Sequence, residues 1–297
     1  MRISSSKRIH LLFRSYKVPG PKKYEVLLKL EATCLNPIDW KIQKGKLRPL
    51  FPRKFPYIPG TDVAGEVVEV GAEVKNFKTG DRVVAELGHL YGGGLAEYAV
   101  AKESLTVVRP AEVSAAEGSG LLVSGIAAYQ ALTQHGLYAV QLAKLGNTHV
   151  TATCGARNME LVRSLGADEV LDYRTPEGEA LRSPSGRKYD VVLHCATGIS
   201  WSTFEPTLSE RGKVIDITPG AGAMMTFFLK KLTFSKKQLV PILTVSPSIE
   251  NLDYLIKLVK EGKLETIIDS KHPLMKAEDA WAKSIDGHAT GKIVVEI

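Results

Sequence analysis

The chain has 297 residues, of which 44% are hydrophobic, so it is long enough for two globular domains, and no long charge-free apolar run predicts a membrane-spanning helix. Its formal net charge of +7 fits an anionic cofactor, attraction to an acidic lipid surface, or solubility alone. Because the lysines and arginines are scattered along the chain, nucleic acid is not an expected partner.

Two features bear on the compartment in which the chain works. Its three cysteines, Cys34, Cys154 and Cys195, lie far apart and form no C-x-x-C motif, which indicates buried free thiols in a reducing compartment. Residues 1–17 contain five basic residues and four serines but no acid, a composition shared by organelle transit peptides. Residues 9–13 could instead form an irregular first strand, and the sequence leaves both interpretations open.

From residue 24 to about residue 110 the pattern is one of short strands and turns. Residues 25–30 predict a strand, and a proline-rich loop covers residues 49–59. The run 59–83, PGTDVAGEVVEVGAEVKNFKTGDRV, is the most specific stretch, because glycines separate its short valine-rich segments. Glycine at such points permits a positive φ or the close approach of another backbone. The pattern is that of a small β-barrel.

The remainder of the chain predicts helices and a parallel sheet. Residues 114–133 favour a helix, with Ser114 and Glu117 placed as a capping box. Strands and helical stretches then alternate, as in an α/β domain. The predicted strands are residues 150–153, 169–171, 190–195 and 213–217, followed by a helix at 251–261 and a last strand at 292–297.

Several motifs occur in the order expected of one family. Besides the run 59–83 they are EATCLNPIDW (31–40), GLAEY (94–98), LGAD (165–168) and GKIVV (291–295). The chain resembles the zinc-independent, quinone-oxidoreductase branch of the medium-chain dehydrogenase/reductase superfamily over residues 18–297. Within it, the chain is most similar to the plant chloroplast-envelope homologues, through residues 39–45, 153–158 and 284–292.

The resemblance implies an α/β fold of two domains. A GroES-like β-barrel catalytic domain would comprise residues 1–111 and 262–297, with the last strand returning to it. A Rossmann-type parallel sheet lacking its first strand would comprise residues 112–261. The resemblance also implies a possible homodimer, and a peripheral location at the chloroplast inner envelope, where an anionic membrane surface would attract the basic chain; the cytoplasm is the alternative.

Ligand chemistry predicts a site without zinc, because the positions that carry thiolate and imidazole ligands in the alcohol dehydrogenases hold Asn36, Thr61 and Asp62. Hydride delivery to quinones or α,β-unsaturated carbonyls, such as oxylipin-like enones, is then the plausible reaction. By resemblance, Asn36 contacts the nicotinamide and Asp39 lines the same cleft. Asn36 could instead cap a turn, and Asp39 could be an acid held by a nearby lysine.

The choice between NADH and NADPH depends on the residues that follow the second Rossmann strand. No acid follows residues 150–153, and Arg157 can pair with a phosphate, so NADPH is favoured over NADH. Arg157 could also be an exposed helix-opening residue. Further candidates for cofactor binding are Asn158, Tyr173, Cys195, Thr218 and Lys292; for Tyr173 and Lys292 the alternatives are a strand-end aromatic and a solvated turn lysine.

The family pattern is broken at Gly136 and Leu137. A strand and a glycine-rich loop that supports the pyrophosphate are expected here, and neither is present. Since that strand is the central one, its loss predicts two half-sheets, and residues 124–145 are expected to form one helix bent near Gly136. The alternative function is therefore a catalytically inactive relative, a truncated isoform or an imperfect gene model, that acts at most as a binding or membrane-associated module.

Overall fold

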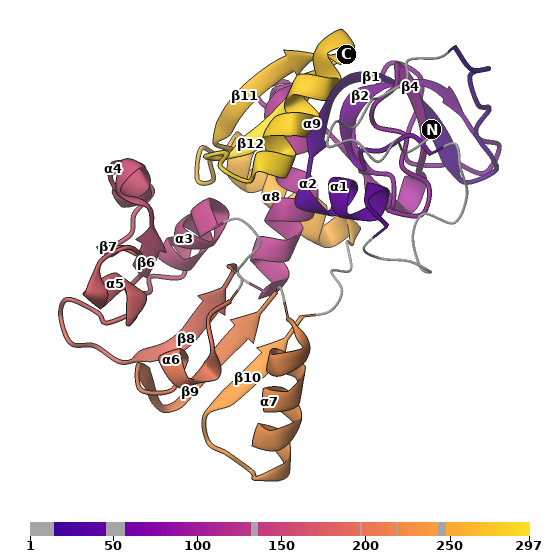
Figure 1. Cartoon of the computed structure of the whole chain (residues 1–297). Helices are drawn as coiled ribbons and strands as arrows, with labels where there is room; N and C mark the ends of the chain where they lie inside the picture. Colours follow the sequence, from indigo (N-terminus) through magenta and orange to yellow (C-terminus); the bar gives the residue numbers. More distant parts are fainter. Residues whose placement is uncertain (1–14, 46–56, 132–135, 197, 218, 243–247) are drawn as a thin grey trace. The chain divides into compact units, whose positions relative to one another are not determined.

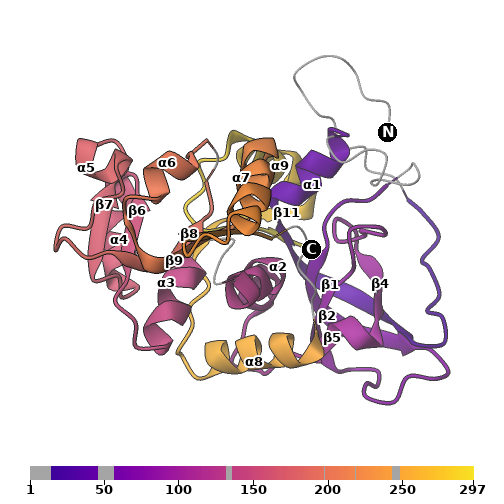
Figure 2. The ribbon, with the colours of Figure 1, turned by 90° about the horizontal axis from the view of Figure 1, so that it is seen from below.

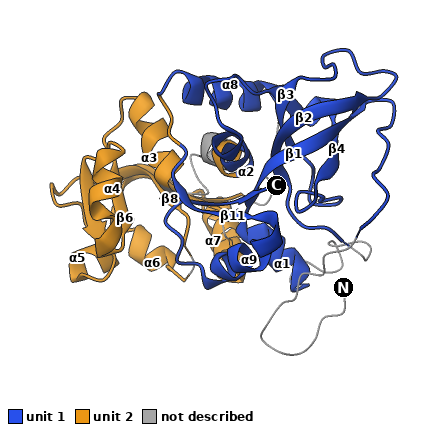
Figure 3. Ribbon diagram, turned by 90° about the horizontal axis from the view of Figure 1, so that it is seen from above, with its two compact units in different colours: residues 1–123, 247–262, 266–297 blue, residues 124–246, 263–265 orange. Residues whose placement is uncertain are grey.

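The computed structural model describes residues 15–45, 57–131, 136–196, 198–217, 219–242 and 248–297. The chain divides into two compact units (Figures 1 and 3). Unit 1 comprises residues 1–123, 247–262 and 266–297, and unit 2 comprises residues 124–246 and 263–265. Unit 1 therefore also takes in residues 112–123 and 247–261, which the sequence assigns to the nucleotide domain. The strand considered for residues 9–13 and most of the proline-rich loop lie outside the described residues.

Unit 1 is built on a seven-stranded sheet in the order β11-β12-β1-β2-β3-β5, with β4 also paired to β1. The long strand β1 (Glu25–Leu35) pairs antiparallel with three others, as the alternation from residue 25 onward predicts. The last strand returns to this unit, as expected. The other strands are β2 (Asp62–Val70), β3 (Arg82–Glu86), β4 (Tyr98–Lys102), β5 (Thr106–Val108), β11 (Ile268–Pro273) and β12 (Lys292–Glu296).

The glycines of the run 59–83 have the roles that the sequence indicates. A Cβ atom on Gly65 would lie 2.3 Å from the carbonyl oxygen of Lys29, and one on Gly71 would lie 1.8 Å from that of Lys22. Gly80 has a φ of +93°, in the region that favours glycine, and turns the chain into β3. These glycines let the strands approach closely around a core of valine, leucine and alanine side chains.

Four helices and two short 3₁₀ turns complete the described part of unit 1. Their bounds are α1 (Pro37–Gln43), α2 (Ala115–Ala131), α8 (Ile249–Lys260), α9 (Ala277–Asp286), η1 (Glu103–Leu105) and η3 (Leu274–Lys276). The boundary between the units falls within α2, so its residues 124–131 belong to unit 2. The predicted capping box is present, because Glu117 accepts from the Ser114 N–H at 2.9 Å and its own N–H donates to the Ser114 hydroxyl at 3.2 Å. Helix α8 lies beside β5 (Figure 2).

Unit 2 contains two separate parallel sheets, which confirms the predicted half-sheets. One has the order β6-β7 and the other β10-β9-β8, so β6 and β8 each have one neighbour among the described strands. The elements are α3 (Gly136–Leu145), β6 (Thr151–Cys154), η2 (Ala156–Asn158), α4 (Met159–Ser164), β7 (Glu169–Asp172), α5 (Pro176–Glu179), β8 (Tyr189–His194), α6 (Trp201–Phe204), β9 (Leu208–Asp216), α7 (Ala221–Leu232) and β10 (Gln238–Pro241).

The physical cause of the split lies in the connection between α2 and α3. Helix α2 ends at Ala131 and α3 begins at Gly136, so the connection has fewer residues than the strand and glycine-rich loop of the family pattern require. The sequence predicts one helix over residues 124–145 that is bent near Gly136, and the structure describes helix on both sides of that point, in α2 and α3. Residues 132–135, where they would join, lie outside the described residues. Strand β8, which has one strand neighbour among the described residues, includes an exposed apolar residue, Val191.

Candidate active site

Strand register in unit 1 brings three polar side chains to one buried point. Leu35 of β1 lies opposite Ile293 of β12, which places the next residue, Asn36, beside Lys292. Cys34 of β1 lies opposite the first residue of β2, Asp62. Three segments distant in sequence therefore converge where β1 ends and α1 begins.

The three side chains form a continuous chain of hydrogen bonds. Lys292 Nζ donates to Asn36 Oδ1 at 2.7 Å, and Asn36 Nδ2 donates to Asp62 Oδ2 at 2.9 Å. Asp62 also accepts from the backbone N–H of Val123 at 3.0 Å and from the Thr61 hydroxyl at 3.1 Å. All three side chains are buried. Because both ends of the Asn36 amide are bonded, its orientation is fixed.

The pKa of Asp62 depends on its burial and on the groups around it. Burial raises the pKa of Asp62, while the Lys292 ammonium and the hydrogen bond from Asn36 lower it. A buried carboxylate and a buried ammonium that are joined through one amide stabilise each other's charged forms. Lys292 is only 2% exposed, so it differs from the solvated turn lysine that the sequence allows.

Asp39 lies next to this chain of bonds and is 1% exposed. Its Oδ2 accepts from the backbone N–H of Asn36 at 2.7 Å, which caps the first turn of α1. Burial raises the pKa of Asp39 to about 7, against the hydrogen bond from the Asn36 backbone, which lowers it. Its Oδ1 has no hydrogen-bond partner among the described residues. The carboxyl group can therefore hold a proton near neutral pH.

Sequence reasoning missed a third buried acid at this site, Glu86, which lies opposite Asp62 across strands β2 and β3. Burial, and then the charge of Asp62, raise its pKa to about 7. Nearby, the Tyr57 hydroxyl donates to the carbonyl oxygen of His89 at 3.3 Å, and burial lowers the pKa of His89. A charged residue ending the apolar strand RVVAE was the signal available in the sequence.

The predicted cofactor residues of unit 2 meet at the carboxyl ends of β6 and β7. Arg157 and Asn158 lie in η2 directly after β6, and Tyr173 directly after β7. The Tyr173 N–H donates to the carbonyl oxygen of Cys154 at 3.1 Å. A Cβ atom placed on Gly155 would lie 3.4 Å from the Tyr173 ring. The Arg174 guanidinium lies 5.5 Å from the centroid of that ring.

Two further cofactor candidates are not part of this cluster. Cys195 follows β8, in the other sheet, and is exposed. Thr218 lies outside the described residues. Both parallel sheets thus end in polar residues at their carboxyl edges, but the strand that joins such edges in a Rossmann fold is missing.

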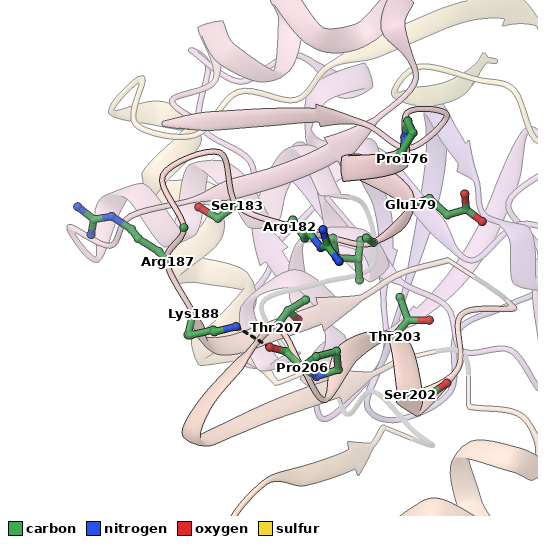
Figure 4. Close-up of a pocket in the computed structure, with 13 residues that line it drawn as sticks. Pro176, Glu179, Arg182, Ser183, Arg187, Lys188, Ser202, Thr203, Pro206 and Thr207 are labelled. Atoms are coloured by element: carbon green, nitrogen blue, oxygen red, sulfur yellow. Dashed lines mark hydrogen bonds between the residues drawn. The ribbon is translucent and has the colours of Figure 1, made fainter.

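Unit 2 also contains a cavity of about 780 Å³ that the sequence did not indicate. It is lined by residues of α5, of α6 and of the segments that lead into β8 and β9, among them Arg182, Ser183 and Thr203 (Figure 4). Lys188 closes part of its rim by donating to the carbonyl oxygen of Pro206 at 2.7 Å. None of the predicted cofactor residues lines this cavity.

The residues that would hold a nicotinamide cofactor fit it in part. An exposed arginine, Arg157, and the half-exposed ring of Tyr173 suit the adenosine end with its extra phosphate. The pyrophosphate requires a glycine-rich loop that opens a helix, and the sequence offers none before α3. The chain therefore offers binding residues for the adenosine end of the cofactor but no glycine-rich loop for its pyrophosphate.

This combination of folds defines a class of oxidoreductase. Residues 22–111 match the alcohol dehydrogenase GroES-like domain, and residues 165–295 match a family described as zinc-binding dehydrogenase. The chain belongs to the quinone oxidoreductase branch of the medium-chain dehydrogenase/reductase superfamily, a family of enzymes with a GroES-like domain and a Rossmann-like sheet.

Two related plant proteins and one solved bacterial structure show how similar the chain is to known proteins. The chain is 67% identical to a chloroplast envelope quinone oxidoreductase homolog of Arabidopsis thaliana, over 94% of this chain and 92% of the relative. It is 33% identical to the NADPH-dependent alkenal/one oxidoreductase, chloroplastic, of the same plant, over 94% of this chain and 73% of the relative. The quinone oxidoreductase of Coxiella burnetii superposes with a TM-score of 0.81 at 27% identity, covering 95% of this chain and 93% of the other.

The alignment with the first relative also bears on the missing strand. It is 302 positions long although only 94% of this 297-residue chain lies within it. The relative therefore has residues with no counterpart here, as the break in the family pattern at Gly136 and Leu137 predicts.

Proposed function

We propose that the protein is an NADPH-dependent, zinc-free reductase that delivers hydride to quinones or to α,β-unsaturated carbonyls. The observation that carries the proposal is the buried chain of bonds from Lys292 through Asn36 to Asp62, beside the protonatable Asp39. The names of the relatives support it, since they include a quinone oxidoreductase homolog and an NADPH-dependent alkenal/one oxidoreductase.

The donor groups favour a reaction without zinc. Thiolate and imidazole are the ligands of catalytic zinc, whereas the corresponding positions Asn36, Thr61 and Asp62 carry an amide, a hydroxyl and a carboxylate. The Asn36 amide oxygen already accepts from a lysine ammonium, so a cationic group occupies the position next to it. No group of three or more histidine, cysteine or acidic residues suited to a metal occurs in the part of the chain that the structure describes.

In the proposed mechanism each residue has a limited task. NADPH supplies the hydride when it is bound. Asn36, whose amide is held by Lys292 and Asp62, orients the nicotinamide end. Asp39 holds a proton near neutral pH and passes it toward the acceptor oxygen as negative charge develops there. We assign Lys292 to the support of Asn36 rather than to the extra phosphate of NADPH, because a buried ammonium is not open to an exposed phosphate.

The binding of NADPH is proposed to rest on unit 2. Arg157 would pair with the extra phosphate, with Tyr173 beside the adenosine and Asn158 and Cys195 as further contacts. Because the pyrophosphate loop is missing, we expect binding to be weaker than in an intact relative. In this proposal the catalytic domain corresponds to residues 1–111 and 262–297 and the nucleotide domain to residues 112–261.

The place of action is proposed from the relatives. We propose peripheral attachment at the chloroplast inner envelope and a homodimer as the assembly; a relative named for the chloroplast envelope supports the compartment. Within the described residues, no helix has the length and apolar character needed to cross a membrane.

A second candidate function is a binding or membrane-associated module without turnover. The split of the parallel sheet into β6-β7 and β10-β9-β8 favours it, because the cofactor site of this fold lies where these strands are joined.

A titration with two readouts separates the two candidates. We expect the folded protein to quench or enhance NADPH fluorescence on binding and to oxidise NADPH when a quinone or an enone is added. Arg157→Gln should lower the affinity for NADPH about tenfold while leaving that for NADH nearly unchanged. Arg187→Gln, at another exposed arginine of unit 2, is the matched control.

The outcomes are distinct. Turnover in the wild-type protein overturns the inactive candidate. A sample that is folded by circular dichroism, yet binds no NADPH and oxidises none, overturns the reductase proposal. Asp39→Asn should keep NADPH binding and lower turnover, and unchanged turnover would remove Asp39 from the mechanism.

A further inference from the structure

The cavity of about 780 Å³ in unit 2 has the size of a small-molecule binding site. Of the segments that line it, residues 186–188 lead into β8 and residues 206–207 lead into β9 (Figure 4). The cavity therefore adjoins the amino ends of these strands. Cys195, the cofactor candidate of the same sheet, follows the other end of β8, about 20 Å away along the strand. Since cofactors of parallel α/β sheets bind at the carboxyl ends, this cavity lies outside the edge where NADPH is expected.

The wall of the cavity that carries Arg182 is held in place by the protein itself. Leu181 packs into a buried core cluster with a φ of +53°, a conformation that is unfavourable for leucine and is often kept at binding sites. The N–H of Arg182 donates to the carbonyl oxygen of Glu177 at 2.9 Å. On its other side, the Ser183 hydroxyl donates to Glu169 Oε2 at 2.7 Å. The backbone around Arg182 is thus fixed without a ligand.

Two basic side chains of the cavity lack an acidic partner. The Arg182 guanidinium and the Lys188 ammonium lie among the other lining side chains (Figure 4). Figure 4 shows the Arg187 guanidinium and the Glu179 carboxylate pointing away from them. Lys188 donates to the carbonyl oxygen of Pro206 at 2.7 Å, and its other N–H groups stay available. Among the described residues, no carboxylate pairs with Arg182 or Lys188, so an anion would complete the charges here.

Neutral polar groups line another part of the cavity. Ser202 and Thr203 of α6 and Thr207 before β9 bring hydroxyl groups, which both donate and accept hydrogen bonds. None of the residues that line the cavity is aromatic, so it offers no ring on which a nucleotide base could stack. The lining therefore suits a ligand body that carries several hydroxyl groups.

We infer that this cavity binds a soluble sugar phosphate or polyol phosphate. Its phosphate would lie between Arg182 and Lys188, and its hydroxyl groups would meet Ser202 and Thr203. A phosphate monoester carries nearly two negative charges at neutral pH and neutralises both basic groups, whereas a carboxylate neutralises one. Guanidinium and ammonium are the usual side-chain donors to phosphate. The inference goes beyond the proposed reduction and depends on neither NADPH binding nor turnover.

NADPH is the competing ligand, because it also carries a phosphate monoester. The residues proposed for it follow the strands of unit 2, and none of them lines the cavity. Its adenine would find no aromatic ring there. We therefore expect the two ligands to bind independently, which a titration in the presence of the other ligand measures directly.

Isothermal titration calorimetry with the full chain tests the inference, using glucose 6-phosphate as the probe. We expect glucose 6-phosphate to bind at least about tenfold more tightly than glucose or inorganic phosphate, because only the ester reaches both parts of the lining. Arg182→Gln and Lys188→Gln should each lower its affinity about tenfold, the effect of one charged hydrogen bond. Glutamine at position 188 can still donate to the Pro206 carbonyl oxygen, so this variant removes the charge specifically.

The matched control is Arg187→Gln, the same substitution at a guanidinium that points away from the cavity. It should bind glucose 6-phosphate as the wild type does. Because the three substituted side chains are exposed, thermal unfolding should be unchanged in all variants. As a second readout, Trp201 directly precedes Ser202, so its fluorescence should change on binding. Trp201→Phe should lose that signal and keep the calorimetric one.

Each outcome decides a separate point. Folded wild-type protein that binds no glucose 6-phosphate overturns the inference, as does binding that Arg182→Gln and Lys188→Gln leave unchanged. Competition by saturating NADPH would assign the phosphate site to the cofactor instead. Displacement by vesicles that contain phosphatidylglycerol would make a lipid headgroup the ligand and overturn the soluble one. Loss of NADPH oxidation with glucose 6-phosphate binding intact would overturn the reductase proposal alone.

Discussion

Replacing Lys292 by methionine should destabilise unit 1 strongly, and more so as the pH rises. The substitution keeps the apolar stem but removes the ammonium that donates to Asn36 and lowers the pKa values of Asp62 and Asp39. Removing one partner of a buried charged pair costs about 3–5 kcal/mol, because the other charge stays buried without compensation. We expect a loss of that size at pH 8.

The pH dependence follows from the same electrostatics. Without the ammonium, the pKa values of Asp62 and Asp39 rise further, so both carboxyl groups carry less negative charge at pH 5 than at pH 8 and less charge stays uncompensated. The cost of the substitution should therefore be smaller at pH 5 than at pH 8.

The control is Lys271→Met. Lys271 lies on the neighbouring strand β11 and pairs with Glu296 at 3.0 Å, but its side chain is 48% exposed. Loss of such a surface pair should cost less than about 1 kcal/mol. Urea unfolding is followed by tryptophan fluorescence in a Trp201→Phe background, so that only Trp40 and Trp281 of unit 1 report. A Lys292→Met variant as stable as the control would refute the buried network.

Three further predictions concern unit 1. Burial raises the pKa of Asp39 to about 7 from an ordinary value of 3.8, so the stability contributed by its protonated carboxyl group is fully present below pH 4 and is lost as the pH rises to about 7. Over this pH range, the melting temperature of Asp39→Asn should fall less than that of the wild type. Gly71→Ala should destabilise by more than about 1 kcal/mol in urea unfolding, since its Cβ would lie 1.8 Å from a carbonyl oxygen, whereas Gly20→Ala, with nothing within 4 Å, should not. Trp281→Phe removes the buried hydrogen bond in which the indole N–H donates to the Gln43 amide oxygen at 2.8 Å, and should lower stability by about 1–3 kcal/mol; an unchanged unfolding midpoint would contradict this.

Local features of the fold could be predicted because local sequence determines them. The capping box at Ser114 and Glu117 needs only residues three apart, and each predicted strand of unit 2 needs only a short apolar run. The two half-sheets were predictable for a related reason: the chain is too short between α2 and α3 to supply a strand, whatever surrounds it.

The candidate site could be predicted only in part. The resemblance indicated Asn36 and Asp39, but Lys292 was expected either in a solvated turn or at a phosphate. Its ammonium reaches Asn36 across 256 positions of sequence through the register of β12 on β1. Glu86 was missed because its pKa depends on burial and on Asp62 across the sheet.

The amino-acid sequence by itself determined the family, several of the strands and the loss of the central one, because spacing and chain length carry that information. The tertiary structure alone decided which polar residues are buried together and which apolar residues stay outside. Residues 221–232 form an apolar helix, and only the structure shows that Phe227 packs on the core while Phe228 and Leu232 face solvent. Burial is a property of the assembled neighbours, which sequence periodicity does not contain.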